Sequence, residues 1–186
     1  KPLLGVLFKL TGFKKRSEIK KAPLAHQSKV LHDLLNKARL TQFGRHYEFD
    51  KILKQADSIE AFQEKIPFHT YEEMHHWWKK TLKGEEDVTW PGRTEYFALS
   101  SGTSEGSSKY IPVTKAMLRS IQRVGVRQML SLRNCSIKPD FFQRNILMLG
   151  GSSDLDSNGV RAAGDLSGIT TGRLPFWFRP FYKPGR

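Results

Sequence analysis

The residues of this chain best suited to chemistry lie in one stretch, Ser-Ser-Gly-Thr-Ser-Glu-Gly-Ser-Ser-Lys. Glycines permit backbone conformations and close approaches that a Cβ forbids. Successive backbone N–H groups in a turn form a concave nest for phosphate oxygens, and hydroxyls and an ammonium group add donors. The stretch therefore predicts an anion-binding loop. Its candidate binding residues are Ser100, Ser101, Gly102, Thr103, Ser104, Gly106 and Lys109.

Short apolar runs flank this loop and indicate how it is held. Residues 96–99 precede it and residues 110–113 follow it, and each run is typical of a buried strand. Thr114 then predicts the N-cap of a long helix that continues to about Arg133. The predicted buried stripe of that helix is Met117, Leu118, Ile121, Val124 and Leu132. A second row on it, Arg119, Arg123 and Arg127, is predicted to face water.

The first third of the chain has the periodicity of helices. Leucines recur at helical spacing in residues 23–39. A second helix is expected to begin with Ser58 as its N-cap and to end before Pro67. A third is expected to begin after Thr70, because Glu73 stands where a capping box requires it.

Three stretches after the long helix carry further signals. Residues 145–149 are typical of a buried strand. Residues 150–154 and 164–172 are rich in glycine and hydroxyl side chains and are predicted to be loops. Residues 174–182 form a dense aromatic cluster, which would be an exposed apolar patch unless the remainder of a longer polypeptide covers it.

These patterns predict a fold class of mixed α and β. We expect a helical region over residues 1–92 and an α/β region with the loop over residues 93–186, both parts of one larger domain.

Charge and cysteine content narrow the function. The net charge is +13, of which +9 falls in residues 1–54 and +4 in residues 55–186. The excess favours anionic partners in general, but it is concentrated away from the loop. No apolar run is long enough for a transmembrane helix. Cys135 is alone, so an internal disulfide and a multi-cysteine zinc site are excluded, and a reducing, cytoplasmic compartment fits.

A metal site is not predicted. Three histidines are close in sequence, but His75 and His76 are adjacent and would point about 100° apart on a helix. Solvated or packing roles are the default for them.

The position of the lysine excludes familiar phosphate loops. A P-loop needs its lysine directly after the second glycine, whereas Lys109 stands three residues after Gly106. The dinucleotide fingerprint Gly-x-Gly-x-x-Gly is absent. A Ser-x-x-Lys motif would need serine at position 106.

The remaining pattern, Ser-Ser-Gly-Thr-Ser-x-Gly-x-x-Lys between two strands, resembles the nucleotide loop of adenylate-forming enzymes of the firefly-luciferase-like superfamily. Most of that superfamily has the lysine two residues after the glycine, with proline between. The spacing from Gly106 to Lys109 agrees instead with the auxin-responsive Gretchen Hagen family of acyl acid amido synthetases. The resemblance extends upstream over residues 62–84 and downstream over residues 111–114. The chain is identified as an N-terminal fragment of a bacterial member of this family.

The resemblance implies a two-step, ATP-dependent reaction, with Mg²⁺ bound through the nucleotide. A small carboxylic acid is adenylated, and an amino acid then forms an amide and releases AMP. It implies that the loop residues contact the phosphates. It also makes Lys109 the candidate catalytic residue, which neutralises the leaving pyrophosphate or holds the loop shut. The family's later Tyr-Arg-x-Gly-Asp motif for the ribose is not found in these 186 residues. We therefore expect the chain alone to be inactive or to bind ATP weakly.

Two alternatives remain open. A basic nucleic-acid-binding module would explain the charge, but no DNA or RNA motif is visible, which disfavours it. In the other, the chain is a structural fragment without activity, and the loop is a plain polar turn.

Overall fold

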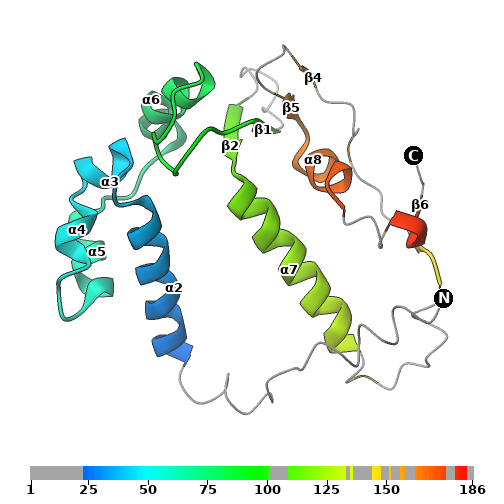
Figure 1. Cartoon of the computed structure of the whole chain (residues 1–186), viewed down its shortest axis with the longest axis horizontal. Helices are drawn as coiled ribbons and strands as arrows, with labels where there is room; N and C mark the ends of the chain where they lie inside the picture. The colour runs from blue at the N-terminus through cyan, green and yellow to red at the C-terminus, as the bar shows by residue number, and fades with distance from the viewer. Residues whose placement is uncertain are drawn as a thin grey trace. The chain divides into compact units, whose positions relative to one another are not determined.

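The computed structural model describes residues 23–100, 109–132, 135, 144–147, 151, 156–157, 162–174 and 179–183. They fall into a helical unit, which ends at Thr94, and a mixed unit, which begins at Glu95 (Figure 1). Each unit has its own apolar core. The content of helix and strand confirms the predicted mixed fold class. The predicted division of one larger domain into regions 1–92 and 93–186 stays a prediction.

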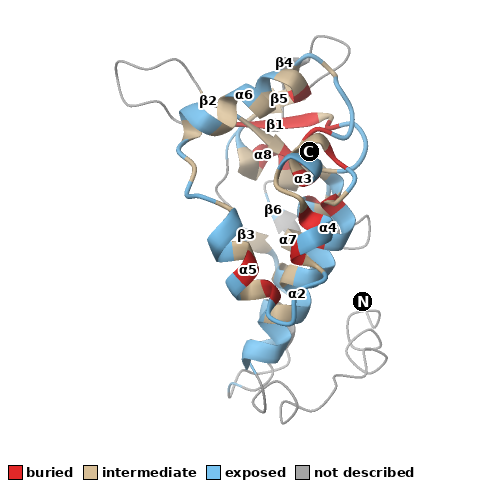
Figure 2. Ribbon diagram, turned by 90° about the vertical axis from the view of Figure 1, so that its left-hand side faces the viewer, coloured by how far each residue is buried: buried red, intermediate tan, exposed pale blue. Residues whose placement is uncertain are grey.

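The helical unit consists of short helices packed around one cluster. Its elements are α2 (Pro23–Ala38), α3 (Gln42–His46), α4 (Phe49–Ile52), α5 (Ser58–Lys65) and α6 (Tyr71–Leu82). Leu35, Phe49 and Ile52 are its largest buried side chains, with Ala38 and Ala61 beside them. Figure 2 shows these buried positions on the faces that α2, α4 and α5 turn inward. The leucine periodicity of residues 23–39 is therefore confirmed as a helix.

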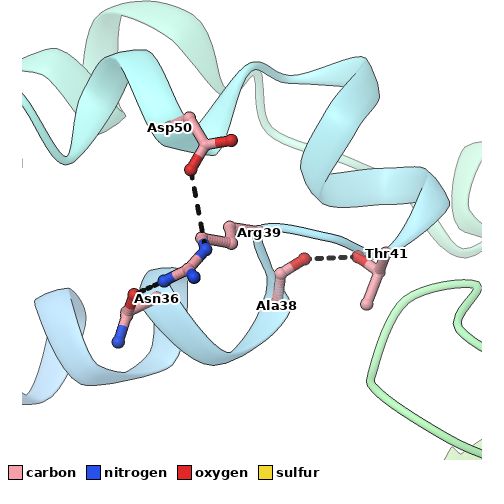
Figure 3. Close-up of polar contacts among 5 residues, drawn as sticks. All are labelled: Asn36, Ala38, Arg39, Thr41 and Asp50. Carbon is pink, nitrogen blue, oxygen red and sulfur yellow. Dashed lines mark hydrogen bonds and ion pairs between the residues drawn. The ribbon is translucent and has the colours of Figure 1, made fainter.

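The turn between α2 and α3 is held by polar side chains (Figure 3). Thr41 Oγ1 donates to the carbonyl of Ala38 at 2.6 Å and accepts from the N–H of Gly44 at 3.0 Å. The Arg39 guanidinium donates to Asn36 and lies 3.7 Å from a carboxylate oxygen of Asp50. Thr41 is 1% exposed, so the backbone groups at this turn are satisfied without water.

In the helical unit, one predicted cap is confirmed and one is wrong. Thr70 N donates to Glu73 Oε2 at 2.6 Å and Glu73 N donates to Thr70 Oγ1 at 3.3 Å, which is the expected capping box of α6. Helix α5 is capped by Asp57, whose carboxylate accepts from the N–H groups of Ile59 and Glu60. Ser58 is the first helical residue instead. A carboxylate can accept both N–H bonds and suits the positive end of a helix dipole.

The mixed unit is built on a four-stranded sheet with the order β2-β1-β5-β4. Its main elements are β1 (Tyr96–Ser100), β2 (Lys109–Val113), α7 (Lys115–Ser131), β4 (Asp156–Ser157), β5 (Ala162–Gly164) and α8 (Leu166–Gly172). β1 pairs antiparallel with β2 and parallel with β5. A separate parallel pair joins β3 (Ile146–Leu147) to β6 (Tyr182–Lys183), after the 3₁₀ turn η3 (Arg179–Phe181). The strands predicted on either side of the loop are confirmed. β3 lies within the predicted strand 145–149, but Leu147 is 70% exposed, so the expected burial is wrong at that residue.

The long helix α7 differs from its predicted pattern of burial. Its N-cap is confirmed, because Thr114 Oγ1 accepts from the N–H of Met117 at 3.1 Å. Of the predicted stripe, Leu118 is buried in the core, but Met117 is 39% and Val124 49% exposed. Ile121 and Leu132 are only partly buried, so the predicted stripe is not a buried face along the length of α7. The row Arg119, Arg123 and Arg127 is exposed, as predicted.

The stretch 164–172 is a strand end and a helix rather than the predicted loop. Gly164 ends β5, and α8 begins at Leu166. Asp165 caps the helix, and Ile169 is 2% exposed in the core of the mixed unit. Burial of one isoleucine and a good N-cap outweigh the weak helix propensity of glycine and threonine here. No helix among the described residues is long and apolar enough to cross a bilayer.

Candidate functional site

The β1–β2 hairpin places the two ends of the predicted anion-binding loop opposite each other. Ser100 is the last residue of β1, Lys109 is the first residue of β2, and the two are register partners. The loop therefore leaves and re-enters the sheet on neighbouring strands. The other candidate residues, Ser101, Gly102, Thr103, Ser104 and Gly106, lie outside the described residues.

The strand that carries Ser100 is firmly held. β1 is an interior strand of the sheet, with β2 on one side and β5 on the other. Phe97 is 0% exposed, and its neighbours Tyr96 and Ala98 are also buried (Figure 2). The Arg173 guanidinium lies over the Tyr96 ring, 4.9 Å from its centroid, a distance suited to a cation–π contact. A loop that starts from a strand buried in this way has one end fixed in position.

A second element reaches the same end of the sheet. Ala98 of β1 and Gly164 of β5 are partners in a parallel register, so the carboxyl ends of both strands lie side by side. Ser100 comes two residues after Ala98, and Asp165 directly follows Gly164. In open sheets the carboxyl ends of parallel strands are where ligands bind. Asp165 is thus placed near the start of the loop by the pairing of the strands.

Asp165 accepts two hydrogen bonds from one residue. Its Oδ1 accepts from the backbone N–H of Ser167 at 2.7 Å and from the Ser167 hydroxyl at 2.6 Å. These bonds lower the pKa of Asp165 from its ordinary value. Ser167 Oγ accepts in turn from the N–H of Gly151 at 2.7 Å. The structure therefore joins two glycine and serine stretches that are separate in the sequence.

The sequence patterns point to both stretches, but they do not single out Asp165 or Ser167 as residues that connect them. The available signal was an aspartate directly before Leu-Ser, where Asp is a favoured N-cap residue. The bond from Gly151 could not be found this way, because it joins residues 16 positions apart.

The other polar candidates have structural roles. His69 Nε2 is 3.0 Å from the Tyr47 hydroxyl, and His76 lies against the ring of Trp77. His75 lies beside the ring of Tyr71. In the part of the chain that the structure describes, no three His, Cys, Asp or Glu side chains gather as a metal-binding group. Cys135 is exposed, which differs from the common buried role of a lone cysteine.

Comparisons with known proteins identify the family and the fold. A family model described as the GH3 family N-terminal domain matches residues 13–178. The acyl acid amido synthetase AtGH3.15, solved in complex with 2,4-DB, is 19% identical with a TM-score of 0.66. That match covers 84% of this chain and 27% of the other. A second structure, of the GH3.15 acyl acid amido synthetase, is 21% identical with a TM-score of 0.61, covering 78% and 26%.

The chain thus spans about a quarter of the length of these solved proteins. At such identities the likeness concerns the fold, and it confirms the predicted one, which matches the N-terminal part of these enzymes. A comparison with curated proteins gives no match.

Proposed function

The chain belongs to the GH3 family, and from this premise we propose that it is the N-terminal part of an ATP-dependent acyl acid amido synthetase. The solved neighbours are enzymes of that name, which supports this class of reaction. In the first step, a carboxylate oxygen of a small acid attacks the α-phosphate of ATP, forming an acyl-adenylate and releasing pyrophosphate. In the second, the amine of an amino acid attacks the acyl carbon, forming an amide and releasing AMP and a proton.

The observation that carries this proposal is the register of Ser100 with Lys109 across the hairpin. A loop of residues 101–108 that is pinned at both ends can present its backbone N–H groups and hydroxyls to one anion. Charge builds on the phosphoryl oxygens as the bond to pyrophosphate breaks, and donors already in place stabilise that charge without reorganisation.

Each loop residue has a proposed role. Ser100, Ser101, Thr103 and Ser104 donate hydroxyl hydrogen bonds to phosphate oxygens, and Gly102 and Gly106 allow the backbone to approach them. Lys109 neutralises charge on the leaving pyrophosphate. Mg²⁺ bound through the nucleotide would neutralise part of the negative charge on the same oxygens. A cytoplasmic location, where ATP and amino acids are available, completes the proposal.

The test uses the full-length protein and carboxylate-dependent exchange of labelled pyrophosphate into ATP. Because a preorganised donor to a charged transition state is worth about 10²–10³ in rate, Lys109→Met and Ser101→Ala should each lower the exchange rate about 100-fold. Lys79→Met, which removes an exposed lysine of α6 in the helical unit, is the matched control and should leave the rate unchanged.

Unchanged exchange in both loop variants, at an unchanged melting temperature, would overturn the assignment of the loop. A wild-type protein that binds DNA or RNA, with affinity falling steeply as salt rises, but shows no exchange with a panel of carboxylic acids would favour the nucleic-acid alternative.

A further inference from the structure

Helix α7 carries a row of arginines for which the described part of the chain supplies no counter-charge. Arg119, Arg123 and Arg127 stand four residues apart, so each step rises about 6 Å along the helix and the side chains share one face. All three are exposed, and no carboxylate of the described residues pairs with any of them. Residues 115–131 contain no aspartate or glutamate. The row is therefore a strip of positive charge about 12 Å long.

This row destabilises α7 when it stands alone. Like charges four residues apart on a helix repel each other. The middle of the helix is Val124, Gly125 and Val126, three residues of low helix propensity. Beside the row, Met117 is 39% and Val124 49% exposed, and the two stand seven residues apart on a second strip of the exposed surface. A partner with negative charge and an apolar strip would relieve the repulsion and cover both apolar side chains.

The helical unit, in contrast, has carboxylates for its basic side chains. Residues 23–94 contain eleven Lys+Arg and eleven Asp+Glu, and Arg39 pairs with Asp50 as Lys65 does with Glu48. Residues 95–186 contain thirteen Lys+Arg and only six Asp+Glu. Counter-charges for the arginines of α7 are therefore expected from outside these residues.

An acidic amphipathic helix fits this surface better than a nucleic acid does. Carboxylates four residues apart on a facing helix repeat at the same step of about 6 Å, and each guanidinium can hold a carboxylate through two N–H bonds. Apolar side chains of that helix would cover Met117 and Val124. A phosphate backbone would pair with the arginines but would leave both apolar side chains in water.

We propose that this surface of α7, defined by Arg119, Arg123, Arg127, Met117 and Val124, docks an acidic helix from the part of the polypeptide that follows residue 186. The chain spans about a quarter of the length of the solved proteins that it matches, so a longer protein has room for such a helix. The inference goes beyond the proposed reaction. It rests on the proposed function in one respect, that the chain is the N-terminal part of a longer enzyme.

The first test reverses the central charge, with Arg123→Glu in the full-length protein. On a solvated helix the new carboxylate would stand four residues from both Arg119 and Arg127, and these attractive pairs would raise the melting temperature slightly. Against an acidic helix it would face other carboxylates and should lower the melting temperature by about 3 °C, with a smaller fall at high salt. Arg45→Glu, the same reversal at an exposed arginine of α3, is the control and should shift it by less than about 1 °C. An unchanged or raised melting temperature in Arg123→Glu would overturn the proposal.

The second test locates the partner by chemical cross-linking. Arg123→Lys keeps the positive charge and adds an amine, which a carbodiimide couples to a carboxylate in contact with it. Lys115 is a positive control in the same sample, because its Nζ lies 2.7 Å from Glu95 Oε1. Mass spectrometry of the monomer band should find the new amine joined to an aspartate or glutamate beyond residue 186.

Other results of the cross-linking contradict the proposal. If the Lys115–Glu95 link forms but position 123 gives no link beyond residue 186, the arginines are solvated. A link found only at the mass of a dimer makes a second copy the occupant. If no link forms and Arg123→Glu abolishes binding to a DNA duplex, nucleic acid is the occupant.

Pyrophosphate exchange separates this inference from the proposed reaction. Exchange without the cross-link overturns the docking of an acidic helix and leaves the proposed reaction standing. The cross-link without exchange in wild type supports the docking and overturns the proposed reaction.

Discussion

Helices in both units begin with polar N-cap residues. Caps in the helical unit bond only to nearby backbone groups, whereas one cap in the mixed unit is also connected to a distant segment. Thr41 and Thr70 bond to backbone groups within three residues, so each completes the turn in which it lies. Asp165 also caps its own helix, but its partner Ser167 extends the contact to Gly151. The caps at Thr41 and Thr70 thus complete local turns, while the cap at Asp165 also connects separate segments, at the end of the sheet where the predicted anion-binding loop begins.

The apolar cores of the two units also differ in how far apart their residues lie in the sequence. Leu35, Phe49 and Ile52 come from helices that follow one another closely along the chain. Val113 and Ile169, in contrast, are far apart in sequence and meet across the sheet. The helical unit can form from nearby contacts, whereas the mixed unit depends on distant pairing. The strand that carries the start of the predicted loop, β1, therefore depends for its position on β5, which comes much later in the sequence.

The largest difference in stability is expected between alanine substitutions at two helical glycines, one in each unit. In Gly44→Ala, the new Cβ would lie 2.1 Å from the carbonyl oxygen of Ala38 at a tightly packed turn, so the backbone must move. We expect a loss of about 3 kcal/mol in the free energy of unfolding. Gly125→Ala, in the open part of α7, should instead gain up to about 1 kcal/mol from helix propensity.

Urea unfolding followed by tryptophan fluorescence measures this difference well in the helical unit, which holds Trp77, Trp78 and Trp90 of the four tryptophans. Circular dichroism at 222 nm follows α7 as well. Equal effects of the two substitutions would show that the turn at Gly44 is not tightly packed.

A smaller loss in the free energy of unfolding is expected when a helix cap is removed. Thr70→Ala removes an acceptor for the N–H of Glu73, and Glu73→Ala removes the return bond to Thr70. Each should cost about 1 kcal/mol, and Thr114→Ala in the mixed unit, which loses a single bond to Met117, should cost about the same. The free energies from denaturant titration check these values. If Glu73→Ala costs nothing beyond Thr70→Ala, the two bonds do not act as a reciprocal box.

The smallest effect expected is a dependence of stability on pH in the helical unit. Ion pairs of Glu48 with Lys51 and Lys65, the second at 2.7 Å, lower the pKa of Glu48 from 4.5 to about 2. A folded-state pKa below the unfolded value stabilises the fold above pH 4.5, and this contribution is lost as the pH falls toward 2. Because the pair is exposed, the effect is small and weakens in salt.

Glu48→Gln tests this directly. The melting temperature of the variant, measured from pH 6 to pH 2, should fall less steeply than that of wild type over the acidic part of the range. Glu60→Gln, at an exposed glutamate of α5, is the control and should follow the wild-type curve more closely. Identical slopes in Glu48→Gln and wild type would contradict the proposed contribution.

Much of the helical unit could be predicted because its signals are short. The capping box of Thr70 and Glu73 spans three residues, and the helix over residues 23–38 follows from leucine spacing. The hairpin strands were predicted from short apolar runs for the same reason. The assignment of Ser58 as a cap was wrong because Asp57, one residue earlier, is the stronger acceptor.

Local patterns in the sequence predict the capping box of α6, the helix over residues 23–38 and the two hairpin strands, because hydrogen bonds and side-chain periodicity within a few residues specify them. The anion-binding loop between those strands stays a prediction. Other features follow from the fold as a whole: β5 lies parallel to β1, Ser167 joins Asp165 to Gly151, and Met117 and Val124 of α7 stay exposed. These features depend on which distant segments meet. Burial and pairing across the chain are set by packing of the whole sheet, which no local pattern encodes.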